Sequence, residues 1–179
     1  MILKFLLAKK IHLKVILCIF IKKLNQMETS LRILENNRNV YLRFLESFSL
    51  EQLNKIPQGF SNNIIWNIGH IIVTQQILVY KLSSLPSMVS KEMEETYING
   101  SFPTGKTKQH EVDKLKELLT SSVKKAKEDF INQALFENFQ QYTTKSTGFT
   151  INNALDALAF NNFHEGVHFG IMLQIRKFI

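Results

Sequence analysis

Four stretches of the chain place apolar residues at helical spacing. In residues 30–49 apolar side chains recur three, four or seven positions apart, on one face of a helix: Leu31, Leu34, Tyr41, Leu45 and Phe48. Residues 109–132 carry Leu115, Leu119, Ser122 and Ala126 on one face and many charges elsewhere. Residues 61–85 are apolar on most sides, and their β-branched run would also suit a strand, but the stretch is too long for one. A fourth helix is predicted from after Thr150 to about Phe178.

Two polar connections separate these predicted helices. Residues 86–109 contain Pro86, Gly100, Pro103 and Gly105, and residues 133–149 contain Gly148, so both stretches are predicted to be long loops. No repeat at a fixed period is present. The pattern therefore predicts an all-α fold, a four-helix bundle with long loops between helices two and three and between helices three and four. Long loops in compact domains often flank binding sites.

Composition supports a helical fold and limits the chemistry. The chain has 179 residues, enough for one domain with a sizeable core, and its 45% hydrophobic and 21% charged residues are ordinary for a globular protein. Seven Gly and three Pro are few for an all-β protein. Cys18 is the single cysteine, so the rest of the chain has no disulfide and no cysteine nucleophile or metal ligand.

The net charge of +7 is concentrated in the first 26 residues. Of the 22 Lys and Arg residues, six lysines lie there without any acid, so 16 basic and 15 acidic residues remain beyond them. The body of the protein is therefore almost neutral. It lacks the basic face that neutralises phosphates, which argues against a nucleic-acid partner.

Residues 1–26 permit two interpretations. Lysines interrupt their apolar residues, and the longest apolar run, residues 15–21, is too short for a transmembrane span and is followed by no signal-cleavage site. A basic helix that lies on anionic lipid is one interpretation. The favoured one is that translation begins at Met27, because Glu28-Thr29-Ser30 and a regular helical pattern follow. We therefore expect a cytoplasmic domain over residues 27–179, with membrane contact only if the first segment is present.

Three histidines are predicted to point into the bundle. His164 and His168 lie four residues apart, so their side chains share one face of the fourth helix, one turn apart. They belong to an inward stripe that is completed by Ala157, Asn161, Ile171 and Ile175. On the second helix His70 lies on a similar stripe, with Trp66, Val73 and Ile77.

Three inward imidazoles on two helices indicate a metal site. A histidine pair at i and i+4 supplies two nitrogen ligands to one ion, and the facing helix supplies the third. Three neutral imidazoles with an open fourth position are typical of catalytic zinc, where a bound water or thiol loses its proton near neutral pH. Each histidine taken alone would more often be a hydrogen-bonded core residue. The pair, together with a third histidine on an independent stripe, favours metal.

Residues 164–168 also spell H-E-x-x-H, the zinc-protease signature. In those proteases a third ligand follows further along the chain, whereas the 11 residues after His168 contain no His, Asp or Glu. These features argue against a protease and favour a coincidental match to the motif. Glu165 is rotated about 100° from His164 around the helix. It is predicted to be a solvated charge or an interface contact, with general base as its alternative, catalytic role.

The sequence resembles the DinB-like (DinB/YfiT) superfamily of metal-binding four-helix bundles. Residues 62–71, NNIIWNIGHI, resemble the family's helix-two segment with its histidine, and residues 161–170, NNFHEGVHFG, resemble its closing helix with the HxxxH pair. Tyr142-Thr143-Thr144 resembles its third connection. The resemblance covers residues 27–177, and it implies that His70, His164 and His168 hold a divalent metal.

The resemblance implies zinc or nickel as the metal, a small-molecule substrate and a homodimer. Characterised members include thiol-dependent transferases and isomerases that use bacillithiol or mycothiol, and metal-dependent hydrolases. The expected function is that of a metal-dependent thiol S-transferase or hydrolase. The alternative is a non-catalytic, stress-associated metal- or ligand-binding bundle. Asn67 and Asn161 lie within a turn of the histidines and are expected to orient imidazole N–H groups, Asn161 being the better candidate because a buried Asn is otherwise costly.

Overall fold

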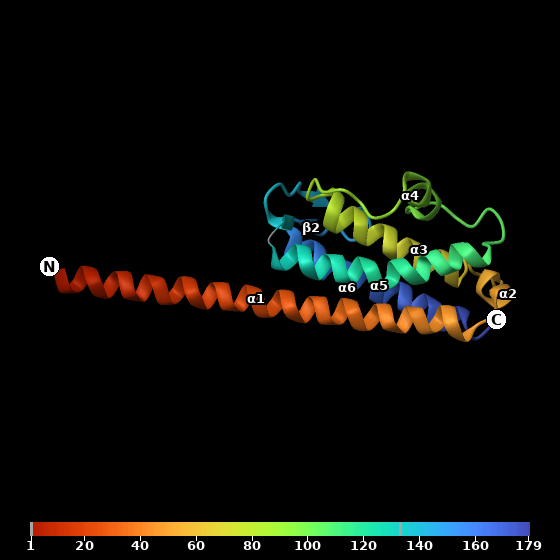
Figure 1. Ribbon diagram of the computed structural model, residues 1–179, viewed down its shortest axis with the longest axis horizontal. Coiled ribbons are helices and arrows are strands. Elements are labelled where there is room, and N and C mark those ends of the chain that lie inside the picture. Colours follow the sequence, from red (N-terminus) through yellow and green to blue (C-terminus); the bar gives the residue numbers. More distant parts are fainter. Residues whose placement is uncertain (1, 133) are drawn as a thin grey trace.

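Four long helices lie side by side and form the body of the molecule (Figure 1). The computed structural model describes residues 2–132 and 134–179. The helical elements are α1 (Ile2–Ser47), α2 (Leu50–Asn54), α3 (Ile64–Gln75), the π-helical turn η1 (Gln76–Lys81), α4 (Lys91–Tyr97), α5 (Gln109–Ile131), the 3-10 turn η2 (Ala134–Phe136) and α6 (Ala154–Ile175). The strands β1 (Tyr142–Thr143) and β2 (Thr150–Ile151) pair antiparallel. The predicted all-α bundle is confirmed.

Side-chain caps set where the two site-bearing helices begin. Asn63 caps α3, and its Oδ1 accepts a hydrogen bond from the backbone N–H of Trp66 at 2.8 Å. Asn153 caps α6 by accepting from the backbone N–H groups of Leu155 and Asp156. Each cap satisfies donors that a helix N-terminus leaves unpaired.

The predicted loop over residues 86–109 is wrong in part, because it contains α4. Ser90 caps this seven-residue helix by accepting from the backbone N–H of Met93 at 3.2 Å. Tyr97 at its end is buried, and a Cβ added at Gly69 of α3 would meet its ring. The connection therefore brings a short helix against α3, next to His70. The second connection, residues 133–149, carries the turn η2 and the strand β1, which pairs with β2 just beyond it.

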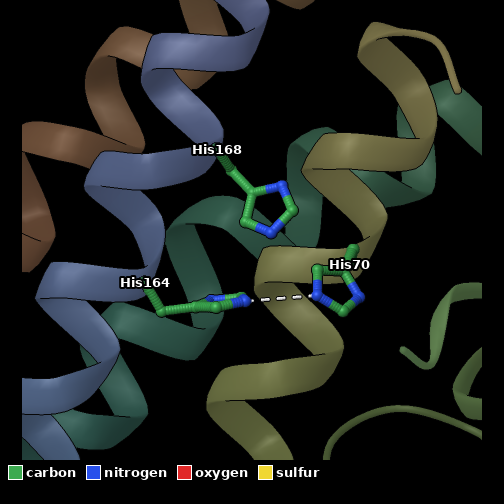
Figure 2. A group of neighbouring side chains, drawn as sticks. All are labelled: His70, His164 and His168. Carbon is green, nitrogen blue, oxygen red and sulfur yellow. Dashed lines mark hydrogen bonds between the residues drawn. The ribbon is translucent and has the colours of Figure 1, made fainter. Parts of the chain in front are cut away.

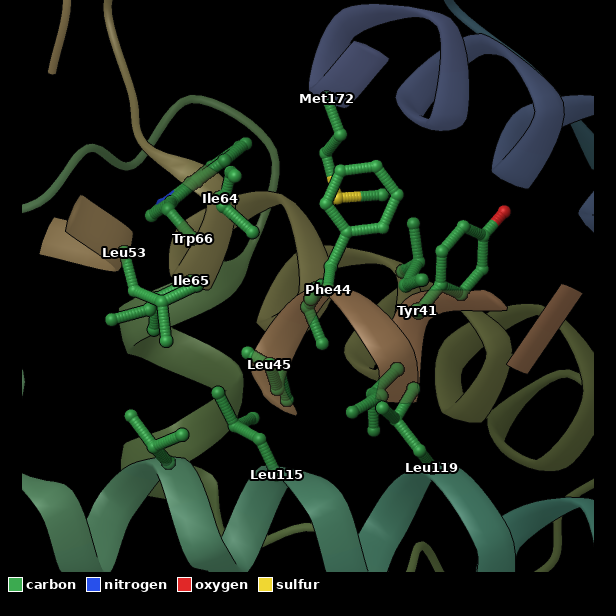
Figure 3. Packing of buried hydrophobic residues seen from close by; sticks show 14 of the residues in the cluster. Tyr41, Phe44, Leu45, Leu53, Ile64, Ile65, Trp66, Leu115, Leu119 and Met172 are labelled. Atoms are coloured by element: carbon green, nitrogen blue, oxygen red, sulfur yellow. The ribbon is translucent and has the colours of Figure 1, made fainter. Parts of the chain in front are cut away.

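The core consists of two apolar clusters that are separated by a buried polar layer. One cluster gathers side chains from α1, α3, α5 and α6, including Tyr41, Phe44, Leu119 and Met172 (Figure 3). The other gathers side chains from α1, η1, α5 and α6 and includes Leu34, Val79, Val123, Phe130 and Leu158. Along each helix, buried polar residues fall between the two sets: Arg38, Gln75, Gln76, Ser122, Asn161 and Glu165. This polar layer lies at the level of the histidines.

Helix α1 is continuous through Met27 and projects well beyond the bundle towards its N-terminus (Figure 1). In this projecting part Ile16, Leu17, Ile21 and Leu24 are exposed. Within the part of the chain that the structure describes, none of the helices has both the length and the apolar character of a membrane span.

Candidate metal centre

The three predicted histidines meet between α3 and α6 (Figure 2). His70 comes from α3, and His164 and His168 come from successive turns of α6. The Nε2 atoms of His70 and His164 are 3.2 Å apart, and one ring nitrogen from each histidine lies within 4.8 Å of the others. Such a group of nitrogens is close enough to bind one ion together.

Two contacts fix the ring of His70. Its Nδ1–H donates to the backbone carbonyl of Tyr97 at 2.7 Å, and the ring stacks on Trp66 with centroids 4.8 Å apart. Because a carbonyl can only accept, Nδ1 carries the proton and the Nε2 lone pair faces the other histidines. The hydroxyl of Thr74 lies 3.4 Å from that Nε2.

Asn67 fixes the ring of His168 in the same way. The amide nitrogen of Asn67 donates to Asn62 Oδ1 and to the backbone carbonyl of Asn63, so its Oδ1 is left to accept from His168 Nδ1 at 2.8 Å. The Nε2 of His168 is therefore the nitrogen with a free lone pair. Two of the three rings are thus held in the tautomer that presents Nε2, an arrangement typical of metal-binding histidines. The donor set fits a divalent cation.

The surroundings keep all three histidines neutral. Burial is the main cause that lowers the pKa of His164 to about 3, and the charges of His168, His70 and Arg38 contribute to the same shift. Burial and then His70 lower the pKa of His168 to about 4. Burial also lowers the pKa of His70, against the hydrogen bond to Tyr97. Neutral imidazole is the form that binds metal, so the site needs no deprotonation near neutral pH.

We expect the metal-free protein to lose stability in acid because its histidines are held neutral. With folded-state pKa values of about 3 for His164 and about 4 for His168, the unfolded chain binds more protons below its ordinary histidine pKa of about 6.5. The stabilisation is therefore complete above about pH 6.5 and decreases as the pH falls towards 4. Thermal melts in a chelator between about pH 7 and pH 5 measure it.

The control for this acid effect is the double variant His164→Asn/His168→Asn, which removes both groups. Its melting temperature should change less over the same pH range than that of the parent protein. Equal pH dependence in the two proteins would show that other groups cause the effect.

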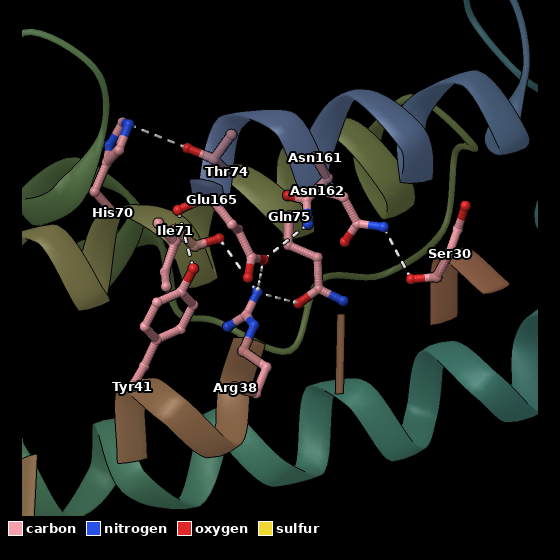
Figure 4. A network of polar contacts seen from close by, with 10 residues as sticks. All are labelled: Ser30, Arg38, Tyr41, His70, Ile71, Thr74, Gln75, Asn161, Asn162 and Glu165. Carbon is pink, nitrogen blue, oxygen red and sulfur yellow. Dashed lines mark hydrogen bonds and ion pairs between the residues drawn. The ribbon is translucent and has the colours of Figure 1, made fainter. Parts of the chain in front are cut away.

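Glu165 is buried and not solvated, so the prediction of a solvated charge is wrong. Its side chain is fully buried and accepts from Arg38 Nη2 at 2.7 Å and from Asn161 Nδ2 at 2.8 Å (Figure 4). Burial raises the pKa of the Glu165 carboxyl, against the lowering effect of Arg38 and Asn161. Its carboxylate is thus part of the polar layer, and this geometry does not support a general base for a ligand beside the histidines.

The two predicted asparagines differ in what they contact. Asn67 orients His168, as expected for a residue that positions an imidazole. Asn161, the preferred candidate in the sequence, donates to Glu165 instead of to a histidine. The physical reason is that the buried line of α6 runs through Asn161, Glu165 and Met172, whereas His164 and His168 lie half-buried on its flank towards α3.

Arg38 connects the helices that carry the histidines, and the sequence pattern led to no prediction for it. It is 2% exposed, and its Nη2 also donates to Gln75 Oε1 at 3.1 Å and to the backbone carbonyl of Ile71 at 3.4 Å. One guanidinium from α1 therefore joins α3 next to His70 with α6 next to His164 (Figure 4). A signal existed, because Arg38 continues the apolar stripe of the first helix, four residues after Leu34.

A cavity of about 570 Å³ opens onto the three histidines. Residues of α3 and α6 line it together with the turn between β1 and β2. Its volume lies within the range of small-molecule sites. The histidines are therefore accessible to a ligand from one side, whereas Glu165 is not among the residues that line this cavity.

A comparison with protein-family models identifies the family of the chain. No curated protein matches the chain. The family model described as DinB superfamily matches residues 33–172, which include His70, His164, His168 and the Arg38–Glu165 pair. This match covers more than half of the chain and includes the C-terminal part of α1, all of α3 and α5, and most of α6. The chain therefore belongs to the DinB superfamily.

Proposed function

We propose that the protein binds a divalent metal ion through His70, His164 and His168 and is a metal-dependent enzyme of the thiol S-transferase or hydrolase type. The observation that carries the proposal is that one ring nitrogen of each histidine converges on a common point. The rings of His70 and His168 are held in place by hydrogen bonds at their Nδ1 atoms, which leaves Nε2 for the metal. Zinc and nickel both suit imidazole ligands.

The residues around the histidines suit this function. A metal bound there would lower the pKa of a water or of a low-molecular-weight thiol such as bacillithiol in the remaining position. Tyr97 and Asn67 hold the rings of His70 and His168, and Trp66 covers one face of His70. The Thr74 hydroxyl, beside His70 Nε2, can donate to or accept from a bound ligand. The cavity admits a small-molecule substrate.

A second candidate function is a non-catalytic metal- or ligand-binding bundle. No Asp or Glu is among the described residues that line the cavity, so none of them supplies a carboxylate as general base. This observation favours the non-catalytic candidate. The absorption spectrum of the cobalt-substituted protein separates the two candidates. Added thiols and small anions should change the spectrum if a coordination position is open, and should leave it unchanged if the protein fills that position.

The metal content of the purified, untagged protein tests the site itself. We expect about one zinc or nickel ion per chain by mass spectrometry and almost none in His164→Ala/His168→Ala, because two of three ligands are lost. The control is His110→Ala, which removes an exposed histidine outside the triad and should retain the metal. Stoichiometric metal in the folded double variant would refute the assignment, as would a parent protein that takes up no metal when zinc or nickel is supplied.

A further inference from the structure

The cavity beside the histidines has an apolar wall on α6. Phe163 is 56% exposed and Val167 is 48% exposed, although both are apolar and line the cavity. Phe160 lies beside Phe163 with ring centroids 5.7 Å apart, and its other neighbour is Phe149, on which it stacks with the rings 5° from parallel. The Phe163 ring is tilted by 51° from that of Phe160, so the exposed face of Phe163 is an apolar surface that a ligand can cover.

The cavity lining also carries one positive charge. Lys145 is the single Lys, Arg, Asp or Glu among the described residues that line it. This lysine lies in the turn between β1 and β2, where Gly148 N–H donates to the Thr144 carbonyl and the hydroxyls of Thr144 and Thr147 are 2.8 Å apart. These bonds order the turn and thereby place Lys145 at the cavity.

From the exposed apolar surface and the single lysine we infer that the cavity binds a small organic anion with a flat apolar group. The anionic group faces Lys145, and the apolar group covers Phe163. The inference rests on the proposed function only in placing the ligand at the same site, because neither Lys145 nor Phe163 belongs to the histidine cluster. Lys145 is exposed to solvent, so a neutral ligand gains no charge pair with it, and a cationic ligand is repelled because the described lining contains no acid.

Trp66 makes this inference directly measurable. It is the one tryptophan of the chain and it lines the cavity, so quenching of its fluorescence reports occupancy. The probes are 3-phenylpropionate and its neutral amide, which differ in charge and share the ring. The full-length protein is titrated first in a chelator and then with zinc, so that binding near Lys145 is distinguished from binding to a metal.

We expect the carboxylate to bind about five-fold more tightly than the amide to the metal-free protein, as one partly exposed charge pair allows. Lys145→Gln should bring the two affinities together, whereas Lys124→Gln, the same change at an exposed lysine outside the cavity, should retain the difference. Phe163→Ser should weaken both probes by about ten-fold, because it removes the apolar surface.

Equal affinity for the two probes, an unchanged preference in Lys145→Gln, or no quenching by either probe would each overturn the inference. None of these outcomes depends on metal. A protein that fails to bind metal can still prefer the carboxylate, and a protein that binds metal can fail to do so. The two proposals are therefore tested separately.

Discussion

Replacing Arg38 with methionine should lower the free energy of unfolding by about 3–5 kcal/mol. The substitution leaves the fully buried Glu165 without its 2.7 Å partner and removes the donor to Gln75 and to the Ile71 carbonyl. A carboxylate that stays buried without a counter-charge must be protonated or must open the core to water. Urea denaturation followed by circular dichroism measures the change.

Two control variants test whether the Arg38–Glu165 ion pair causes this loss of stability. Arg43→Met makes the same change at an exposed arginine of α1, and it should alter the stability by less than about 0.5 kcal/mol. Arg38→Met/Glu165→Met should be more stable than Arg38→Met alone, because it removes both charges together. If Arg38→Met costs no more than Arg43→Met, the buried ion pair does not stabilise the fold as the structure indicates.

The long helices could be predicted because their apolar spacing is local. Leu31, Leu34 and Tyr41 define the inward face of α1 without reference to any other helix, and all three are buried. The proximity of His164 and His168 follows from helix geometry alone. Their meeting with His70 required the bundle as well, and the structure brings the three together.

The short helix α4 could not be predicted because its stability depends on contacts distant in sequence. Its seven residues contain three glutamates and little apolar pattern, and isolated helices of this length are unstable in water. Tyr97 packs against Gly69 and offers its carbonyl to His70, 27 residues away. Neither contact leaves a periodic signal in the sequence.

The role of Glu165 was missed for a related reason. A glutamate on a helix is usually solvated, and only the position of its ion-pair partner shows that Glu165 is buried. That partner, Arg38, lies 127 residues away on α1. Its own signal, a cation at a position of the apolar stripe, indicates that a buried charge needs a counter-charge but does not say which acid supplies it.

Gly69→Ala should reduce both the stability and the metal affinity, since a Cβ at this position would overlap the ring of Tyr97 and lie 2.6 Å from its Cγ. Tyr97 is buried, so its ring has little room, and α4 must move with it. We expect a loss of about 1–3 kcal/mol in the free energy of unfolding, typical of an overpacked core. Movement of α4 also withdraws the Tyr97 carbonyl from His70 Nδ1, and losing such an orienting contact typically weakens metal binding by about 10–100-fold.

Gly166→Ala is the matched control, because Gly166 lies in α6 between His164 and His168 and a Cβ there would meet no atom within 4 Å. Alanine should stabilise this helix by up to about 1 kcal/mol and leave zinc affinity unchanged. Zinc titration and urea denaturation of both variants test the contrast. If the two alanine variants behave alike, α4 does not hold His70 in place. If only Gly69→Ala loses affinity while it still folds, the orientation of His70 by the Tyr97 carbonyl controls metal binding.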